Sequence, residues 1–217
     1  MNPVNTSSAA RFISIEGGEG GGKSTSIEFI KQQLANAGID CVHTREPGGT
    51  PMAEDIRQLL LAHRDEKVDP YTELLLMFAS RRQHVQNVIR PALDAGKWVI
   101  CDRFTDASFA YQGAGRGLDT EFIGNLKRWV HADLNPDMTL LFDIDVALGM
   151  SRAGKRADFD RIETEAMSFF ERVRQGYLDL ASAEPQRYRV VDAGATIAEV
   201  QVQLEGYLAP LITAHKG

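Results

Sequence analysis

Five glycines between residues 17 and 22, followed directly by Lys23 and Ser24, constrain this chain more than any other feature of its sequence. The spacing Gly17-x-x-x-x-Gly22-Lys23-Ser24 follows an apolar run and precedes a helical pattern, which is the context of a P-loop. Glycines let several backbone N–H groups surround phosphate oxygens without Cβ clashes, and the helix adds free N–H groups. Lys23 can then reach the β- and γ-phosphates of a nucleotide, and Ser24 can supply a hydroxyl to Mg²⁺. The alternative, a glycine-rich turn that binds nothing, does not explain the strand and helix signals on either side.

Length and composition indicate one folded domain with no affinity for a polymer. At 217 residues the chain can bury a large core, and we predict a single domain over residues 11–217. The net charge of −6 argues against a nucleic-acid surface, and no apolar run approaches the about 18 residues of a membrane-spanning helix. Cys41 and Cys101 lie in apolar runs and are expected to be buried thiols, which favours a reducing, cytoplasmic location. Residues 1–10 are mostly polar and have neither a basic start nor an apolar middle, so we expect a disordered tail and no signal peptide.

Short apolar runs alternate with helical periods along the whole chain. The predicted strands are 11–16, 40–44, 98–101, 138–143 and 188–192. The predicted helices include 23–37, 52–61, 71–95, 146–153, 162–183 and 197–211, and the helix at 71–95 is expected to kink near Pro91. A further helix is capped by Asp119 and has Phe122, Leu126, Trp129 and Val130 in register on one face. Residues 113–117 are expected to form a flexible loop that carries Arg116. This alternation predicts an α/β fold, a parallel sheet covered by helices on both faces.

The carboxyl ends of the predicted strands should form the functional edge of the sheet. Right-handed crossovers bring these ends together, and ligands of open α/β sheets bind there. Glu16, Thr44, Cys101 and Asp192 end four of the strands. We therefore expect the P-loop, the residues after each of the other three strands, and a ligand to share one crevice.

Two arginines and a carboxylate follow these strand ends. Arg45 and Arg103 each come directly after a strand that points toward the P-loop, so both are predicted to bind an anion. Asp102 lies where a P-loop protein holds a second carboxylate near Mg²⁺, and a helix cap is its alternative role. The other arginines, taken singly, are expected to be solvated surface charges; they include Arg57, Arg81, Arg82 and Arg116.

A cation-rich segment between two predicted helices is interpreted as a lid. Arg152, Lys155, Arg156 and Arg161 surround Gly154, within a predicted lid of about residues 150–162. A P-loop alone leaves a transferring phosphoryl group open to water, which favours a lid over the alternative, a solvated linker.

Five motifs occur in order and together resemble the thymidylate kinase family of bacteria. They are the P-loop, Thr-Arg-Glu-Pro-Gly-Gly-Thr at 44–50, Cys-Asp-Arg-Phe at 101–104, Ala-Tyr-Gln-Gly at 110–113 with Gly-Arg-Gly at 115–117, and Asp-Arg-Ile-Glu at 160–163. The resemblance extends from about residue 11 to the C-terminus. It implies a three-layer P-loop kinase fold with a five-stranded parallel sheet and a small lid. It also implies phosphorylation of dTMP to dTDP with ATP and Mg²⁺, in dTTP synthesis, by a homodimer.

The resemblance assigns roles residue by residue. The implied dTMP site has Glu19 at the sugar 3′-hydroxyl, Arg45, Arg57 and Arg103 at the phosphate, Arg81, Ser108 and Gln112 at the thymine edge, and Tyr111 in the space of a ribose 2′-hydroxyl. The implied ATP site is Gly17, Gly18, Glu19, Gly20, Gly21, Gly22, Lys23, Ser24 and Thr25, with Asp192 beginning a segment along adenine. Where the family often has a stacking Phe, this chain has Met77, followed by Phe78; Phe78 is assigned to the dTMP site, and contact by Met77 remains open.

The P-loop contains no cation at positions 18–21, which resembles the subtype with its arginine in the lid. Arg152 or Arg156 would then stabilise the moving phosphoryl group, together with Lys23 and Arg103. The acceptor phosphate is already largely ionised at neutral pH, so no strong general base is required.

Three other activities fit parts of the pattern. A deoxynucleoside kinase would need a general base at a sugar hydroxyl, for which Glu16 or Glu19 could be considered. Another nucleoside monophosphate kinase would differ in its base, and a nucleotide-dependent switch would bind nucleotide without transfer. Release of ADP with different acceptors distinguishes all of them.

Overall fold

The computed structural model describes residues 10–154, 161–163 and 165–216. The predicted N-terminal tail lies almost wholly outside these ranges, as do the lid residues Lys155 and Arg156. Among the described helices, none combines the length and the apolar character needed to cross a membrane.

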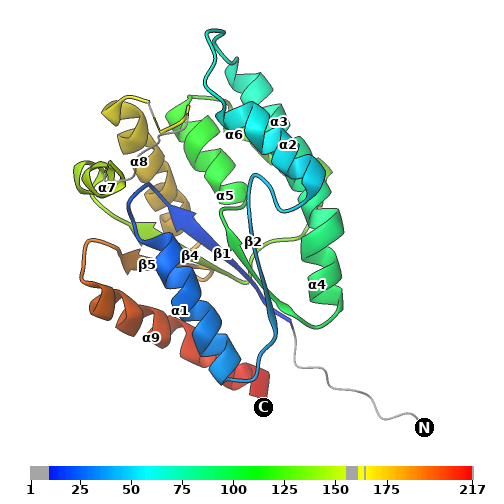
Figure 1. Ribbon diagram of the computed structural model, residues 1–217, viewed down its shortest axis with the longest axis vertical. Coiled ribbons are helices and arrows are strands. Elements are labelled where there is room, and N and C mark those ends of the chain that lie inside the picture. Colours follow the sequence, from blue (N-terminus) through cyan, green and yellow to red (C-terminus); the bar gives the residue numbers. More distant parts are fainter. Residues whose placement is uncertain (1–9, 155–160, 164, 217) are drawn as a thin grey trace.

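The core of the fold is one parallel sheet of five strands in the order β2-β3-β1-β4-β5 (Figure 1). The strands are β1 (Phe12–Gly17), β2 (Cys41–Arg45), β3 (Trp98–Asp102), β4 (Met138–Asp143) and β5 (Tyr188–Asp192). Each lies within one residue of its predicted bounds. The α/β fold with a five-stranded parallel sheet is therefore confirmed.

Helices cover both faces of the sheet, and alternate strand residues face opposite layers. Ile13 and Ile15 of β1 pack with α1 (Lys23–Asn36) and α9 (Ile197–Lys216), whereas Phe12 packs with the helices of the other face. All six residues of β1 are buried, as expected for a strand covered on both sides. The second layer contains α2 (Pro51–Leu61), α3 (Pro70–His84), α4 (Arg90–Asp94), α5 (Thr105–Ser108), α6 (Thr120–His131) and α8 (Met167–Ala183), and α7 (Val146–Ala153) follows β4 (Figure 1).

The long helix predicted at 71–95 is interrupted. A π-helical turn, η1 (Val85–Ile89), separates α3 from α4 directly before Pro91. Proline lacks an N–H and its ring clashes with the carbonyl four residues earlier, so the hydrogen-bond ladder widens there. The predicted kink near Pro91 therefore takes the form of this turn.

The prediction of a flexible loop at 113–117 is wrong for residues 113–115. Residues Phe109–Gly115 form a π-helical segment, η2, which continues α5 and packs along α8. A Cβ at Gly115 would come within 2.6 Å of the Phe169 ring, and a Cβ at Gly176 within 2.6 Å of Ala114 Cβ. Glycine is needed at position 115 because η2 and α8 approach closely there, and not because the chain is flexible.

Two further predictions need correction. The helix predicted from residue 162 begins at Met167, although Ile162 is still buried. Asp119 caps α6 as predicted, but the face expected to be in register is only partly buried, because Phe122 is 37% and Trp129 is 90% exposed. The buried residues of this helix are Ile123 and His131.

Candidate functional site

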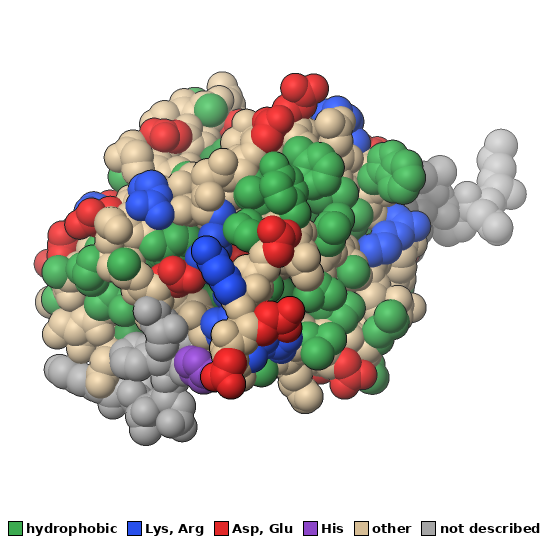
Figure 2. Space-filling model, turned by 90° about the horizontal axis from the view of Figure 1, so that it is seen from above, with side chains coloured by type: hydrophobic (Ala, Val, Ile, Leu, Met, Phe, Trp, Pro, Cys, Tyr) green, Lys and Arg blue, Asp and Glu red, His purple; other side chains and the backbone are tan. Residues whose placement is uncertain are grey.

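A pocket of about 270 Å³ opens at the carboxyl ends of β1, β2 and β3. Seen from above, Lys and Arg side chains run through the middle of this face of the molecule, with Asp and Glu side chains beside them (Figure 2). The P-loop and the segments after β2 and β3 line this pocket together, as the strand-end argument predicts. The segment after β5 was expected in the same crevice but lines a separate cavity. Its lining includes Glu19, Lys23, Ser24, Arg45, Arg57, Met77, Arg81, Asp102, Arg103, Ser108, Tyr111 and Gln112.

The P-loop forms one wall of the pocket. Lys23 donates hydrogen bonds to the carbonyl oxygens of Gly18 at 2.6 Å and Gly17 at 3.2 Å, and its side chain is buried. Burial and the nearby Arg103 guanidinium lower the pKa of the Lys23 ammonium. At Gly20, with φ of +71°, a Cβ would lie 2.0 Å from the carbonyl oxygen of Gly149 in α7, so only glycine fits. The P-loop therefore packs against α7, and its Lys23 side chain lines the pocket.

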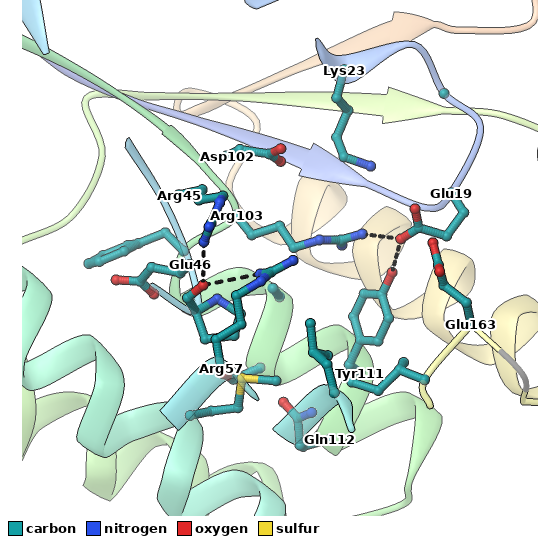
Figure 3. Close-up of a pocket in the computed structure, with 18 of the residues that line it drawn as sticks. Glu19, Lys23, Arg45, Glu46, Arg57, Asp102, Arg103, Tyr111, Gln112 and Glu163 are labelled. Atoms are coloured by element: carbon teal, nitrogen blue, oxygen red, sulfur yellow. Dashed lines mark hydrogen bonds and ion pairs between the residues drawn. The ribbon is translucent and has the colours of Figure 1, made fainter. Parts of the chain in front are cut away.

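Arg103 lies opposite Lys23 in the same pocket (Figure 3). It donates to the Gly17 carbonyl oxygen at 3.0 Å and forms an ion pair with Glu19, and its Cζ is 4.8 Å from the Tyr111 ring centroid. The Tyr111 hydroxyl also donates to Glu19, at 3.5 Å. Arg103, Glu19 and Tyr111 therefore hold one another at the boundary between the P-loop and the rest of the pocket.

Arg45 and Arg57 provide cations from a second direction. Each donates to the carbonyl oxygen of Pro47, at 3.0 Å and 3.1 Å respectively, and Arg45 also pairs with Glu54 at 2.9 Å. Both line the pocket. Arg57 does not follow a strand, so the strand-end argument did not predict it. With Arg103, they make a cluster of three guanidinium groups that can surround a phosphate.

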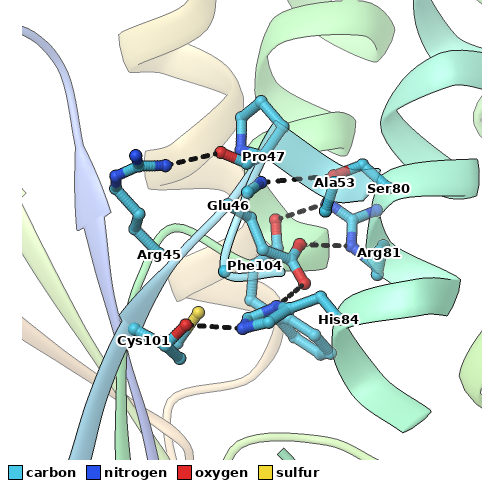
Figure 4. A network of polar contacts seen from close by, with 12 residues as sticks. Arg45, Glu46, Pro47, Ala53, Ser80, Arg81, His84, Cys101 and Phe104 are labelled. Carbon is cyan, nitrogen blue, oxygen red and sulfur yellow. Dashed lines mark hydrogen bonds and ion pairs between the residues drawn. The ribbon is translucent and has the colours of Figure 1, made fainter. Parts of the chain in front are cut away.

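A buried polar network lies behind the segment after β2 (Figure 4). Glu46 accepts a hydrogen bond from Arg81 Nε at 2.6 Å and pairs with His84 Nδ1 at 2.9 Å, and His84 Nε2 lies 2.6 Å from Thr44 Oγ1. Burial raises the pKa of Glu46, but the Arg81 charge and His84 outweigh it and leave that pKa below its ordinary value. The sequence did not indicate the roles of Glu46 and His84, because these residues hydrogen-bond to side chains that are distant in the chain.

Arg81 is fixed at the far end of the pocket. Its guanidinium donates to Ser108 Oγ at 3.1 Å and to the Phe104 carbonyl oxygen at 3.1 Å, besides Glu46. Phe78 lies beneath it, with Arg81 Cζ 4.6 Å from the ring centroid. Phe78 is 2% exposed and is not among the lining residues, whereas Met77 is. The structure thus brings Met77, not Phe78, to the pocket.

Asp102 is the carboxylate that fits a metal ion. Its Oδ1 is buried and has no hydrogen-bond partner among the described residues, and it lines the pocket with Ser24 and Lys23. Because a buried carboxylate oxygen without a partner is costly, a bound Mg²⁺ or one of its water ligands would satisfy it. Glu163, in the segment directly before α8, also lines this pocket and was not predicted.

A second cavity of about 330 Å³ lies on the other side of the P-loop. Arg152 lines this cavity, not the first, and donates to the carbonyl oxygens of Ala193 at 2.7 Å and Gly194 at 3.2 Å. The Asp192 side chain instead accepts from the Gly194 N–H at 2.9 Å. The cavity is lined by the segment after Asp192 and by P-loop and α1 residues, among them Ala193, Ala195, Thr196, Gly20, Gly21, Gly22 and Thr25.

Comparison with known proteins agrees with this geometry. The family model described as Thymidylate kinase matches residues 15–204. The chain is 54% identical over 206 residues to a protein named Thymidylate kinase from Ectopseudomonas mendocina, covering 95% of this chain and 98% of the relative. A thymidylate kinase from Pseudomonas syringae pv. tomato is 53% identical over the same coverage. A crystal structure of thymidylate kinase from Ehrlichia chaffeensis is similar with a TM-score of 0.73 and 35% identity, covering 92% of this chain and 99% of that one.

Proposed function

The chain belongs to the thymidylate kinase family and phosphorylates dTMP to dTDP, and we propose that ATP·Mg²⁺ and dTMP meet end to end in the pocket described above. The observation that carries this proposal is that Lys23 of the P-loop and the cluster of Arg45, Arg57 and Arg103 line the same pocket. A P-loop suits the phosphates of the donor, and a separate group of arginines suits the phosphate of an acceptor.

On the donor side, the phosphates of ATP bind the backbone N–H groups of residues Gly17–Thr25 and the Lys23 ammonium. The adenine lies in the second cavity, along the segment that follows Asp192. This assignment is supported by Gly20, Gly21 and Gly22 of the P-loop, which line both cavities, so one ATP molecule can extend from one cavity to the other.

On the acceptor side, Arg45, Arg57 and Arg103 hold the dTMP phosphate. The sugar lies against Tyr111 and Glu19, and the base reaches Arg81, Ser108 and Gln112 with Met77 against its face. All of these residues line the first pocket, which supports the assignment. Tyr111 is 7% exposed and packs near Phe169 and Tyr177, which holds its ring in the position where it would exclude an additional 2′-hydroxyl.

The reaction needs positioning and charge compensation more than proton transfer. An oxygen of the dTMP phosphate attacks the γ-phosphorus in line, and ADP leaves. Lys23 and Arg103 lie on the two sides of the transferred group and compensate its charge. Ser24 and Asp102 would hold Mg²⁺, which would supply positive charge beside the nucleotide phosphates.

An arginine of the lid compensates the remaining negative charge of the transferring phosphoryl group. We expect Arg156 or Arg152 to contact the transferring group when residues of about 150–162 close over it; Arg156 lies outside the described residues. Arg152→Ala and Arg156→Ala, with kcat and substrate binding measured separately, test this role. Unchanged turnover in both variants would contradict it.

An exposed apolar surface supports a homodimer. We define the helical face as the exposed large apolar residues of α2, α3 and α6: Met52, Leu59, Tyr71, Leu75, Phe122 and Trp129. These helices lie side by side in Figure 1, and Tyr71 packs edge-on against Phe122 at 5.6 Å. Exposed large apolar side chains on neighbouring helices are typical of a protein interface. The expected location of the dimer is the cytoplasm.

The alternative activity, phosphorylation of a deoxynucleoside, needs a free general base. Both candidates are engaged, because Glu16 binds the Phe104 N–H and the Tyr177 hydroxyl, and Glu19 pairs with Arg103. The test is an ADP-release assay with dTMP, dUMP, dCMP, dGMP, AMP and thymidine as acceptors. Turnover should be fastest with dTMP and absent with thymidine, and preference for thymidine would overturn the proposal.

A further inference from the structure

Glu73 of α3 is a buried carboxylate that lies behind the base end of the pocket and outside its lining. It is 1% exposed, yet it accepts hydrogen bonds from three different side chains. Gln112 Nε2 donates to Oε1 at 3.0 Å, Arg116 donates to Oε1 at 3.3 Å and to Oε2 at 3.2 Å, and Arg161 pairs with Oε2. Only Gln112 of these three lines the pocket.

The charge state of Glu73 follows from these contacts. Burial raises its pKa, but hydrogen bonds from Arg161 and Gln112 and the charge of Arg116 outweigh burial and hold the pKa below its ordinary value. The carboxylate is therefore ionised at neutral pH and can only accept hydrogen bonds. Gln112 must turn its NH₂ group toward Glu73, which leaves the carbonyl oxygen of the same amide for the pocket. Figure 3 shows this amide at the end of the pocket away from Lys23.

The two cations keep the carboxylate from turning away. Arg116 Cζ lies 4.7 Å from the Phe169 ring centroid and also pairs with Glu165. Arg161 Nε donates to the Leu60 carbonyl oxygen at 2.9 Å, at the end of α2. Because both guanidinium groups are anchored elsewhere, Glu73 holds the Gln112 amide in a single orientation.

The base end of the pocket thus presents an acceptor from Gln112 beside the donors of Arg81. Thymine offers the matching pair, a carbonyl oxygen at position 4 and an N–H at position 3, whereas cytosine offers an NH₂ and a bare ring nitrogen. A base with the cytosine pattern would leave the Gln112 oxygen facing a ring nitrogen, two acceptors without a proton between them.

We propose that Glu73 is a positioning residue for base selectivity, which it exerts by fixing the amide orientation of Gln112. This inference rests on the proposed function, since it concerns the base of the nucleotide acceptor. It differs from a structural role for Glu73, which would affect all acceptors alike.

The test compares dTMP with 5-methyl-dCMP, which has the same methyl group and nearly the same size. The kcat/KM values for both acceptors are measured in the unaltered protein, in Glu73→Gln and in Glu165→Gln. Glutamine at position 73 can donate as well as accept, so the Gln112 amide is free to turn its NH₂ toward the pocket. The ratio of the dTMP value to the 5-methyl-dCMP value should fall about 5-fold in Glu73→Gln, the worth of one hydrogen bond.

Glu165→Gln is the matched control, because it removes a carboxylate from Arg116 without touching Gln112. It should leave the ratio unchanged. If Glu73→Gln fails to fold, Glu73→Asp keeps the charge but withdraws the carboxylate from Gln112, and the ratio should fall in the same direction. Equal losses for both acceptors in the Glu73 variants, or an equal shift in Glu165→Gln, would overturn the inference. Failure of the unaltered protein to phosphorylate dTMP would instead overturn the proposed function.

Discussion

Glu16 Oε1 accepts a 2.7 Å hydrogen bond from the backbone N–H of Phe104, the residue directly after Arg103. Arg103 has φ of +67°, a left-handed conformation that costs a side-chain-bearing residue about 1–2 kcal/mol. The bond from Phe104 N–H to Glu16 and the bond from Arg103 N–H to the Ile15 carbonyl oxygen at 2.9 Å hold this turn in place. The strand that leads into the P-loop therefore also sets the position of the arginine opposite it.

The first prediction concerns this coupling. Glu16→Ala should lower kcat by about 100-fold, because Arg103 loses the support of its backbone and shifts relative to the acceptor phosphate. Glu16→Gln keeps an acceptor for Phe104 N–H and can donate to the Tyr177 hydroxyl, so it should retain most of the activity. Steady-state kinetics with dTMP at saturating ATP measure both. Equal losses in the two variants would contradict the support of Arg103 by this hydrogen bond.

The second prediction concerns stability against pH. Burial, with Asp106 nearby, raises the pKa of Glu16 from 4.5 to about 8. Between these two values the folded protein keeps a proton that the unfolded chain has released, so the contribution of Glu16 to the free energy of unfolding falls as pH rises through this window. The melting temperature should fall more between pH 5 and pH 8 in the unaltered protein than in Glu16→Gln. Parallel curves for the two proteins would contradict this expectation.

The third prediction concerns the ion pair between Glu46 and Arg81. Both side chains are 3% exposed, so Glu46→Gln leaves a buried guanidinium without its counter-charge. This should cost about 3 kcal/mol of unfolding free energy, measured by urea denaturation. Glu28→Gln is the control, since it removes a carboxylate of the exposed Lys31 pair, and its effect should be too small to resolve. Similar losses in both variants would contradict the buried-pair argument.

The fourth prediction concerns the metal. Asp102→Asn keeps the shape of the side chain but removes the charge from the buried oxygen, which has no hydrogen-bond partner within the described part of the chain. The Mg²⁺ concentration for half-maximal activity should rise by about 10- to 100-fold. Asp143→Asn is the control, because Asp143 also ends a strand but is paired with Arg174 at 2.7 Å, and it should leave the Mg²⁺ dependence unchanged. An unchanged dependence in Asp102→Asn would remove Asp102 from the metal site.

The fifth prediction concerns the helical face. Leu75→Glu places a charge on the helical face, where Leu75 is 50% exposed, and should convert a dimer to a monomer. Ile197→Glu alters a residue that is 66% exposed on α9, away from that face, and should not change the assembly. Sedimentation equilibrium measures the mass of each protein. A monomeric unaltered protein, or a dimer that survives Leu75→Glu, would contradict the dimer proposal.

The parts of the site that sequence predicted share a physical cause. The P-loop is a local motif, and Arg45, Asp102 and Arg103 follow strands whose carboxyl ends meet in any parallel sheet. Their convergence on one pocket required only the correct strands. The roles of Arg57, Arg81 and Gln112 came from the resemblance instead, since each looks like a solvated polar residue when taken singly.

The parts that sequence missed depend on packing between distant segments. Gly113 and Gly115 resemble a loop in a linear reading, yet Gly115 allows η2 to approach α8 closely. Glu73 lies 39 residues from Gln112 in the chain, and Glu46 lies 35 from Arg81, so no local pattern joins the partners. Such side chains act on other side chains, and only the folded structure brings them together.

The most direct test of the account is a crystal structure with dTMP and a non-hydrolysable ATP analogue bound together. The account predicts that the dTMP phosphate contacts Arg45 and Arg103, with one of its oxygens about 3–3.5 Å from the γ-phosphorus of the analogue beside Lys23. A dTMP molecule bound outside this pocket, or with its phosphate directed away from the P-loop, would contradict it.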